Sequence, residues 1–189
     1  ILDAELSRLE AAGVEFRLGR PVDDLAEAAR EARAVFLATG AHGSRDPGVE
    51  VPPCDGVFFG LEFLKRFNAG EKIRTGARLA VVGGGNTAID VARAGLRLGA
   101  NVSLYYRRTL AEMPAHPEEV REAIEEGADF VFQAAPVELT VKDGRVSGLN
   151  LVRMRMGEPD SSGRARPEPV PGSEFHAQAD TVVFAIGET

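Results

Sequence analysis

The residues with the clearest chemical potential form one glycine-rich run. They are Gly83, Gly84, Gly85, Asn86, Thr87 and Ala88. The run matches the pattern Gly-x-Gly-x-x-Gly/Ala and lies between an apolar stretch, 79–82, and an amphipathic stretch that ends at Gly99. In that position Gly83 makes a tight turn, Gly85 lets a pyrophosphate approach the backbone, and Ala88 keeps helix and strand close. The free amides near Asn86 and Thr87, with the positive end of the helix dipole behind them, would bind the phosphates. The run therefore predicts a dinucleotide site; the alternative is an ordinary glycine turn with Asn86 as the helix N-cap.

The end of the next strand indicates which dinucleotide is bound. An NAD site places Asp or Glu about 20 residues after the first glycines, whereas a 2′-phosphate requires arginine. Here the strand ends at Tyr106-Arg107-Arg108, and no carboxylate follows before Glu112. We therefore expect Arg107 and Arg108 to hold the 2′-phosphate of NADPH. The alternative is that both arginines project into water.

The elements around this run alternate between strand and helix. We expect strands at 79–82, 102–106 and 130–132, with helices from the glycine run to Gly99 and over 118–126. This alternation predicts an α/β fold with a parallel sheet covered on both faces. The stretches 137–141 and 146–152 flank Asp143-Gly144, which is typical of a β-hairpin turn. The fold predicted is a Rossmann-like three-layer dinucleotide-binding domain with a parallel sheet and a β-hairpin or meander.

Further elements are expected on both sides of this central region. We expect helices at 1–12 and 22–32, strands at 14–18 and 34–38, a connector over 41–55 and a helix at 61–67. An exposed loop is expected at 157–173, followed by strands at 175–177 and 181–186. The segments 34–40 and 181–187 resemble each other, since each is an apolar run that we expect to be a buried strand ending in Ala-x-Gly. The small residues there would let the backbone approach a ligand or a neighbouring strand, which adds five site candidates: Thr39, Gly40, Ala185, Ile186 and Gly187.

Composition excludes several classes of function. The 189 residues carry 22 Lys and Arg against 29 Asp and Glu, a net charge of -7 that argues against a general nucleic-acid binder. With Cys54 alone, the chain forms no internal disulfide and no cysteine metal cluster, and its three histidines are not at ligand spacing. No apolar run is long enough for a membrane span and no signal peptide is evident, so we expect a cytoplasmic protein without a metal site. Because it begins at Ile1 inside a helical pattern, we expect it to be a piece of something longer.

Four short motifs together resemble a known family. They are Gly-Gly-Gly-Asn-Thr-Ala-Ile-Asp at 83–90, Tyr-Arg-Arg at 106–108, Glu-Met-Pro-Ala at 112–115 and Glu-Glu-Gly at 125–127. They are similar to the NADPH-binding region of the glutamate synthase small (beta) subunit, a family of FAD-dependent pyridine nucleotide oxidoreductases that includes ferredoxin-linked flavoproteins. The resemblance implies that NADPH passes hydride to FAD, and that electrons continue through iron-sulfur clusters to a partner such as the glutamate synthase large subunit.

The resemblance also implies a division of the chain. Residues 1–45 would be a partial FAD-domain segment with a helix, strands and the Ala-Thr-Gly turn at 38–40. Residues 50–189 would be the NADPH-binding domain, which ends at the strand returning to the FAD domain. The family's flavin fingerprint, cluster cysteines and C-terminal Gly-Asp are absent from this sequence. We therefore expect the chain to bind NADPH, to need the remainder of the FAD domain as its partner, and not to retain FAD or activity alone. A rival hypothesis is a regulatory module that senses NADPH without redox turnover; a self-sufficient dehydrogenase is disfavoured because no catalytic group follows the site.

Overall fold

The computed structural model describes residues 2–159 and 165–187. The chain divides into two compact units, Ile1–Gly40 and Ala41–Thr189. Three parts of the sequence predictions lie outside the described residues: the start of the first helix at Ile1, positions 160–164 of the predicted loop, and the last two residues of the predicted second domain.

The N-terminal unit contains two helices, α1 (Leu2–Ala11) and α2 (Leu25–Glu31). The side chain of Asp24 caps α2 by accepting the N–H of Ala26. The predicted strands at 14–18 and 34–38 are wrong, because neither segment is a strand. A strand requires a neighbour to complete its hydrogen bonds, and no described residue pairs with either segment. The expectation that 34–38 is buried is also wrong, since Phe36 is 91% exposed.

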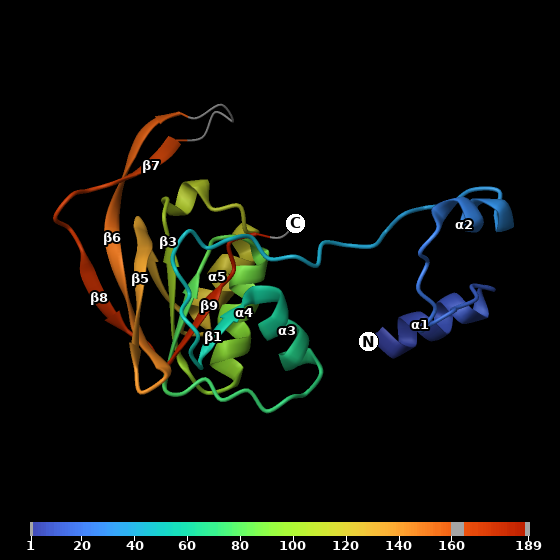
Figure 1. The fold of residues 1–189 in the computed structure, drawn as a ribbon, viewed down its shortest axis with the longest axis horizontal. Coiled ribbons are helices and arrows are strands. Elements are labelled where there is room, and N and C mark those ends of the chain that lie inside the picture. The colour runs from blue at the N-terminus through green and yellow to red at the C-terminus, as the bar shows by residue number, and fades with distance from the viewer. Residues whose placement is uncertain (1, 160–164, 188–189) are drawn as a thin grey trace. The chain divides into compact units, whose positions relative to one another are not determined.

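The second unit is built on a five-stranded parallel sheet with the strand order β1-β9-β2-β3-β4. Figure 1 labels three of its strands, β1, β9 and β3. Its strands are β1 (Val57–Phe59), β2 (Arg78–Val82), β3 (Asn101–Tyr106), β4 (Asp129–Phe132) and β9 (Thr181–Phe184). Three helices connect the first four strands: α3 (Gly60–Asn68), α4 (Asn86–Arg97) and α5 (Pro117–Glu125). The chain thus steps along the sheet from β2 to β4 and returns last to β9, between β1 and β2.

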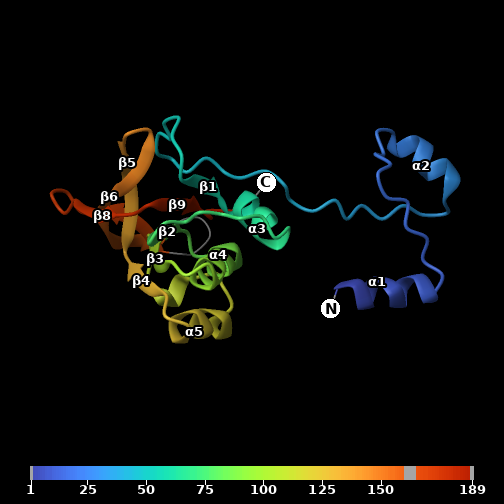
Figure 2. The ribbon, with the colours of Figure 1, turned by 90° about the horizontal axis from the view of Figure 1, so that it is seen from below.

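An antiparallel sheet forms the third layer (Figure 2). Its strands are β5 (Ala134–Lys142), β6 (Arg145–Pro159), β7 (Ala165–Pro169) and β8 (Phe175–Gln178). The turn between β5 and β6 has positive φ angles at Asp143 and Gly144, 52° and 73°, as the hairpin prediction requires. The predicted α/β class with a Rossmann-like parallel sheet is confirmed. Helices α3, α4 and α5 lie on one face of the parallel sheet, and the antiparallel sheet lies on the other.

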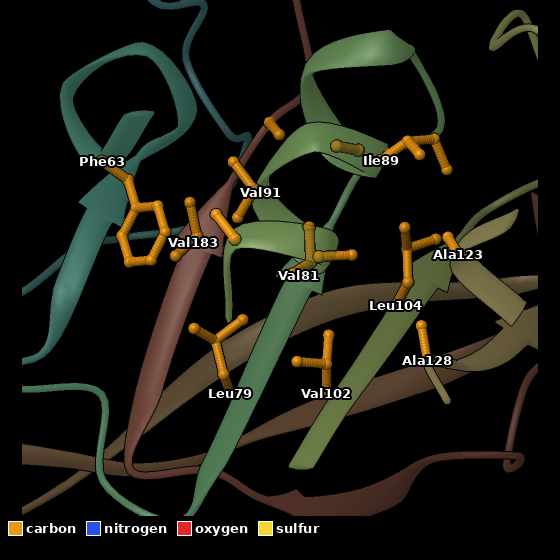
Figure 3. Packing of buried hydrophobic residues seen from close by; sticks show 14 of the residues in the cluster. Phe63, Leu79, Val81, Ile89, Val91, Val102, Leu104, Ala123, Ala128 and Val183 are labelled. Carbon is orange, nitrogen blue, oxygen red and sulfur yellow. The ribbon is translucent and has the colours of Figure 1, made fainter. Parts of the chain in front are cut away.

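Alternate residues of each parallel strand pack into two separate hydrophobic cores, one on each face of the sheet. Leu79 and Val81 of β2 face the helices and pack with Phe63, Ile89 and Leu104 (Figure 3). The other β2 residues, Ala80 and Val82, face the antiparallel sheet. They belong to a second cluster with Leu149, Leu151 and Phe184. Both clusters contain only residues of the second unit. The period-two pattern therefore holds β2, and the glycine run after it, between two packed layers.

Three details of this unit differ from the sequence predictions. β1 was not predicted, because only three residues form it. Part of the predicted loop 157–173 is wrong, since β6 extends to Pro159 and β7 pairs with its second half. The prolines of β7 suggested a loop, yet an edge strand tolerates proline because one side of its backbone needs no partner. The return strand is shorter than 181–186, so residues 185–187 follow β9 rather than belong to it.

Candidate dinucleotide-binding site

The glycine run lies at the carboxyl edge of the parallel sheet, where β9, β2 and β3 end side by side. The N–H of Gly83 donates to the carbonyl of Tyr105 at 3.1 Å, and the N–H of Ala185 donates to the carbonyl of Val82 at 2.8 Å. The chain then turns through Gly84 and Gly85 and begins α4 at Asn86. Open α/β sheets bind ligands at this edge, beyond the carboxyl ends of the strands.

The three glycines are required for different reasons. A Cβ on Gly83 would lie 2.1 Å from the carbonyl oxygen of Ala185, so a side chain there would push β9 away from β2. A Cβ on Gly84 would lie 2.4 Å from ring carbons of Tyr106. At Gly85, in contrast, a Cβ would meet no atom within 4 Å, and the φ angle of -90° suits any residue. No contact among the described residues requires a glycine at Gly85, whereas a ligand that approaches the backbone would.

The start of α4 presents the positive end of a helix dipole to the same space. Gly85 is the N-cap and has no side chain to satisfy the first amides. Its carbonyl accepts the N–H of Ala88 at 2.9 Å, so the intrahelical bonds begin there. Ala88 is fully buried, Thr87 is half-buried and Asn86 is exposed. A helix N-terminus with free backbone N–H groups is a general binding site for anions such as the pyrophosphate of a dinucleotide.

The segment after β3 folds back over the glycine run, and we call residues 107–116 the strap. Its first turn is a 3-10 helix, Leu110–Glu112, closed by a capping box. The carboxylate of Glu112 accepts the hydroxyl of Thr109 at 2.9 Å and the N–H of Thr109 at 3.2 Å. The first carboxylate after β3 is therefore bonded within the strap itself.

Three hydrogen bonds join the strap to β3 and the glycine run. The hydroxyl of Tyr106 donates to the carbonyl of Glu112 at 2.9 Å. The N–H of Ala115 donates to the carbonyl of Gly84 at 3.2 Å. The N–H of His116 donates to the side-chain oxygen of Asn86 at 3.0 Å. The glycine run and the strap thus form one hydrogen-bonded unit.

The two arginines after β3 differ sharply in exposure. Arg107 is exposed, whereas Arg108 is only 6% exposed. Burial raises the pKa of the Tyr106 hydroxyl, and the nearby Arg108 guanidinium partly opposes that shift. The carbonyl of Arg108 also accepts the N–H of Gln133 at 3.1 Å, which connects the strap to the end of β4. The structure therefore presents Arg107 to solvent and packs Arg108 behind Tyr106.

The remaining candidates fall in two places. Ala185 is buried and Ile186 half-buried beside the glycine run, and the exposed Gly187 accepts the N–H of Arg45 at 3.2 Å. Thr39 and Gly40 belong to the N-terminal unit, where both are exposed in irregular backbone. The structure thus brings the candidates at 83–88 and 185–187 together.

Sequence reasoning assigned no role to Tyr106, Ala115 or His116. Ala115 and His116 act through backbone N–H groups, which leave no side-chain signature. One signal could have located the strap: the spacing Thr109-x-x-Glu112 is that of a capping box, and it precedes two prolines.

Other chemistry is limited in the described part of the chain. No group of three metal-ligating side chains occurs among these residues. Burial raises the pKa of the Cys54 thiol, and Asp55 raises it further, which disfavours the reactive thiolate. Within the same residues, no helix has both the length and the apolar character needed to cross a membrane.

Comparison with known proteins identifies relatives along the whole chain. Residues 13–189 match the pyridine nucleotide-disulphide oxidoreductase family. The chain is 45% identical to the NADPH-Fe(3+) oxidoreductase subunit beta of Geobacter sulfurreducens, over 100% of this chain and 29% of the relative. It is 45% identical to the NADP(+)-dependent formate dehydrogenase subunit beta of Moorella thermoacetica, over 100% of this chain and 28% of that relative. It is 41% identical to the NADPH glutamate synthase small chain of Escherichia coli, over 93% and 40%. The chain spans less than half the length of each relative.

Solved structures support the Rossmann-like α/β fold described above. The chain matches T. acidophilum thioredoxin reductase with a TM-score of 0.55 and 16% identity, over 79% of this chain and 42% of that one. Lactococcus lactis thioredoxin reductase matches with a TM-score of 0.53 and 18% identity, over 79% and 43%. At these identities the likeness concerns the fold alone.

Proposed function

The chain belongs to the pyridine nucleotide-disulphide oxidoreductase family, and on that premise we propose that it carries the NADPH-binding unit of an FAD-dependent oxidoreductase of the glutamate synthase beta-subunit type. The nucleotide lies across the carboxyl edge of the parallel sheet, with its pyrophosphate at the start of α4. The observation that carries this proposal is Gly85, where the chain leaves open space beside a helix N-terminus and has no reason of its own to exclude a side chain.

The strap favours NADPH over NADH. A ribose 2′-hydroxyl is normally bound by a carboxylate, but the carboxylate of Glu112 is already bonded to Thr109. Arg107 is exposed at the end of β3, where a 2′-phosphate would lie. A charge-assisted hydrogen bond contributes about 1.5 to 3 kcal/mol, so Arg107 alone supports a preference of about tenfold to hundredfold. Arg108 is buried near Tyr106 and would act indirectly, by holding Tyr106 in place.

The redox role concerns a protein longer than this chain. When bound, NADPH supplies a hydride to FAD, and electrons then pass to iron-sulfur clusters in a partner subunit or domain. The residues of this chain would bind and orient the nucleotide. Two of the relatives are named as beta subunits and a third as a small chain, which supports a multi-subunit enzyme.

The N-terminal unit would belong to the flavin domain. It exposes large apolar side chains, among them Leu18 at 87% and Phe36 at 91%. Exposed apolar side chains in such numbers are typical of an interface. The proposed occupant is the remainder of the FAD domain, so this chain should not retain FAD by itself.

A thermal-shift titration tests the nucleotide assignment. NADPH at 100 times its dissociation constant should stabilise the chain by about 2.7 kcal/mol. NADH at the same concentration, if bound tenfold more weakly, should contribute about 1.4 kcal/mol, so the shift in unfolding midpoint should be about half as large. Equal shifts would contradict the 2′-phosphate assignment, and the absence of any shift would contradict the dinucleotide site.

The redox assignment is tested in the longer protein. NADPH added without oxygen should bleach the flavin absorbance, and Arg107→Ala should slow this at low NADPH more than at saturation. Arg121→Ala is the matched control, because Arg121 is an exposed arginine on α5 whose one ion pair among the described residues is with its helical neighbour Glu118. If NADPH leaves the flavin oxidised, the redox role is wrong even where the nucleotide binds.

A further inference from the structure

We propose that the strap is a positioning device that engages two acceptor oxygens of the phosphate-binding loop and so leaves hydrogen-bond donors for the phosphate. The proposal rests on the dinucleotide function above and gives a binding role to strap residues, which lie outside the glycine run. Its two key groups are the backbone N–H groups of Ala115 and His116, which engage two acceptor oxygens of the loop, the Gly84 carbonyl and the Asn86 side-chain oxygen.

The chemistry of the ligand sets this requirement. A pyrophosphate at neutral pH offers acceptor oxygens and negative charge, so a carbonyl oxygen that faces it is repulsive. The carbonyl of Gly84 would be such a group, and the N–H of Ala115 engages it at 3.2 Å. The Gly84 carbonyl is therefore already hydrogen-bonded when an anion approaches the loop.

The side chain of Asn86 carries both kinds of group, an acceptor oxygen and a donor NH₂. Because a backbone N–H can only donate, the His116 N–H fixes which end of the amide it contacts, namely Oδ1 at 3.0 Å. The NH₂ group is thereby left for a ligand at the start of α4. Without the strap, the amide could rotate and present its oxygen to the phosphate.

The strap is held in place independently of the loop. Its capping box closes the turn between Thr109 and Glu112, and the hydroxyl of Tyr106 donates to the Glu112 carbonyl. The ring of Tyr106 also fills the space that a side chain on Gly84 would need. One tyrosine thus contacts both partners, which places the strap at a fixed distance from the glycine run.

A proline substitution can delete the decisive N–H group without removing a side-chain contact to the loop. His116 has a φ angle of -61°, which suits proline, and it precedes Pro117 at the start of α5. His116→Pro removes the donor to Asn86, whereas His116→Ala removes the same imidazole and keeps the N–H. The ratio of the dissociation constants of these two variants isolates the N–H group.

The full chain should be titrated with NADPH, NADH and adenosine 2′-phosphate, which lacks the pyrophosphate. Relative to His116→Ala, we expect His116→Pro to bind NADPH and NADH about three- to tenfold more weakly, by the same factor for both. Adenosine 2′-phosphate should be bound equally by both variants, a result that a general disturbance of the site would not give. Equal NADPH constants for the two variants would overturn the proposal.

Asn86 supplies a second test that does not need the proline. Asn86→Asp keeps an oxygen for the His116 N–H but turns a second oxygen toward the phosphate, so it should bind NADPH more weakly than Asn86→Ala. In an Asn86→Ala background, His116→Pro should cause no further loss, because the N–H acts through that side chain. Stronger binding by the aspartate than by the alanine variant, or additive losses, would contradict the positioning role. If the unmodified chain binds no dinucleotide, the function itself is wrong rather than the role of the strap.

Discussion

Replacing each glycine of the run by alanine should separate folding from binding. The structure assigns Gly83 to the packing of β2 against the end of β9, and it assigns Gly85 no packing role at all. We therefore expect Gly83→Ala to destabilise the chain and Gly85→Ala to leave its stability nearly unchanged. Binding of NADPH should show the opposite order among the molecules that remain folded.

The magnitudes follow from the contacts. A Cβ on Gly83 would lie 2.1 Å from a backbone oxygen, so two backbones must separate by about 1 Å to accept it. Overpacking costs about 1 to 3 kcal/mol, and a side chain at the φ angle of 151° adds a similar penalty. For a unit of this size, a total of about 2 to 6 kcal/mol lowers the unfolding midpoint by at least about 4 °C.

Gly85→Ala has compensating effects on stability. Alanine is a poorer N-cap than glycine, but it reduces the entropy of the unfolded chain by a similar amount, so the net change should stay within about 1 kcal/mol. The new methyl group would occupy the space through which the pyrophosphate approaches the backbone. Loss of one charge-assisted hydrogen bond there should weaken NADPH at least about tenfold.

Two measurements on each variant decide the matter: urea unfolding followed by circular dichroism, and NADPH titration at a temperature where both variants are folded. Gly99→Ala is a reference for a glycine of positive φ in open space, away from the glycine run. If Gly85→Ala unfolds as readily as Gly83→Ala, the open space at Gly85 has another explanation. If it binds NADPH normally, the pyrophosphate lies elsewhere.

Other predictions concern charges and the two units. Arg107→Ala should weaken NADPH about tenfold or more and NADH less than twofold, whereas Arg108→Ala should lower the unfolding midpoint and weaken both nucleotides alike; paired titrations and melts distinguish them. Asp180 accepts a hydrogen bond from Arg78, which lowers the pKa of its carboxyl group. That stability is present above the pKa of an unfolded aspartate and is lost as the pH falls through the lower folded pKa, so Asp180→Asn should flatten the acid limb of a urea-unfolding series. Residues 41–187 alone should melt within about 2 °C of the full chain, since both cores lie within them.

The site was predictable where side-chain types carry the signal. The spacing of Gly83, Gly85 and Ala88 after an apolar strand leaves few alternatives, and the structure places these residues at a sheet edge and a helix start. The strap was not predictable in the same way, because Ala115 and His116 contribute backbone N–H groups that every non-proline residue has. The separation of Arg107 from Arg108 also needs three dimensions, since adjacent residues of one type differ only in what packs around them.

The echo between the segments 34–40 and 181–187 shows why apolar runs alone do not define strands. Both runs are apolar and end in Ala-x-Gly, and the sequence predicted a buried strand for each. Thr181–Phe184 forms one because β1 and β2 flank it on both sides and complete its backbone hydrogen bonds. The earlier segment finds no such pair among the described residues, and Phe36 is exposed where Phe184 is buried. If the proposed flavin domain supplies the missing neighbours, the amides of 34–38 should become protected from hydrogen exchange in the longer protein and exchange freely in this chain. Equal, fast exchange in both proteins would mean that the apolar run has no strand partner in either.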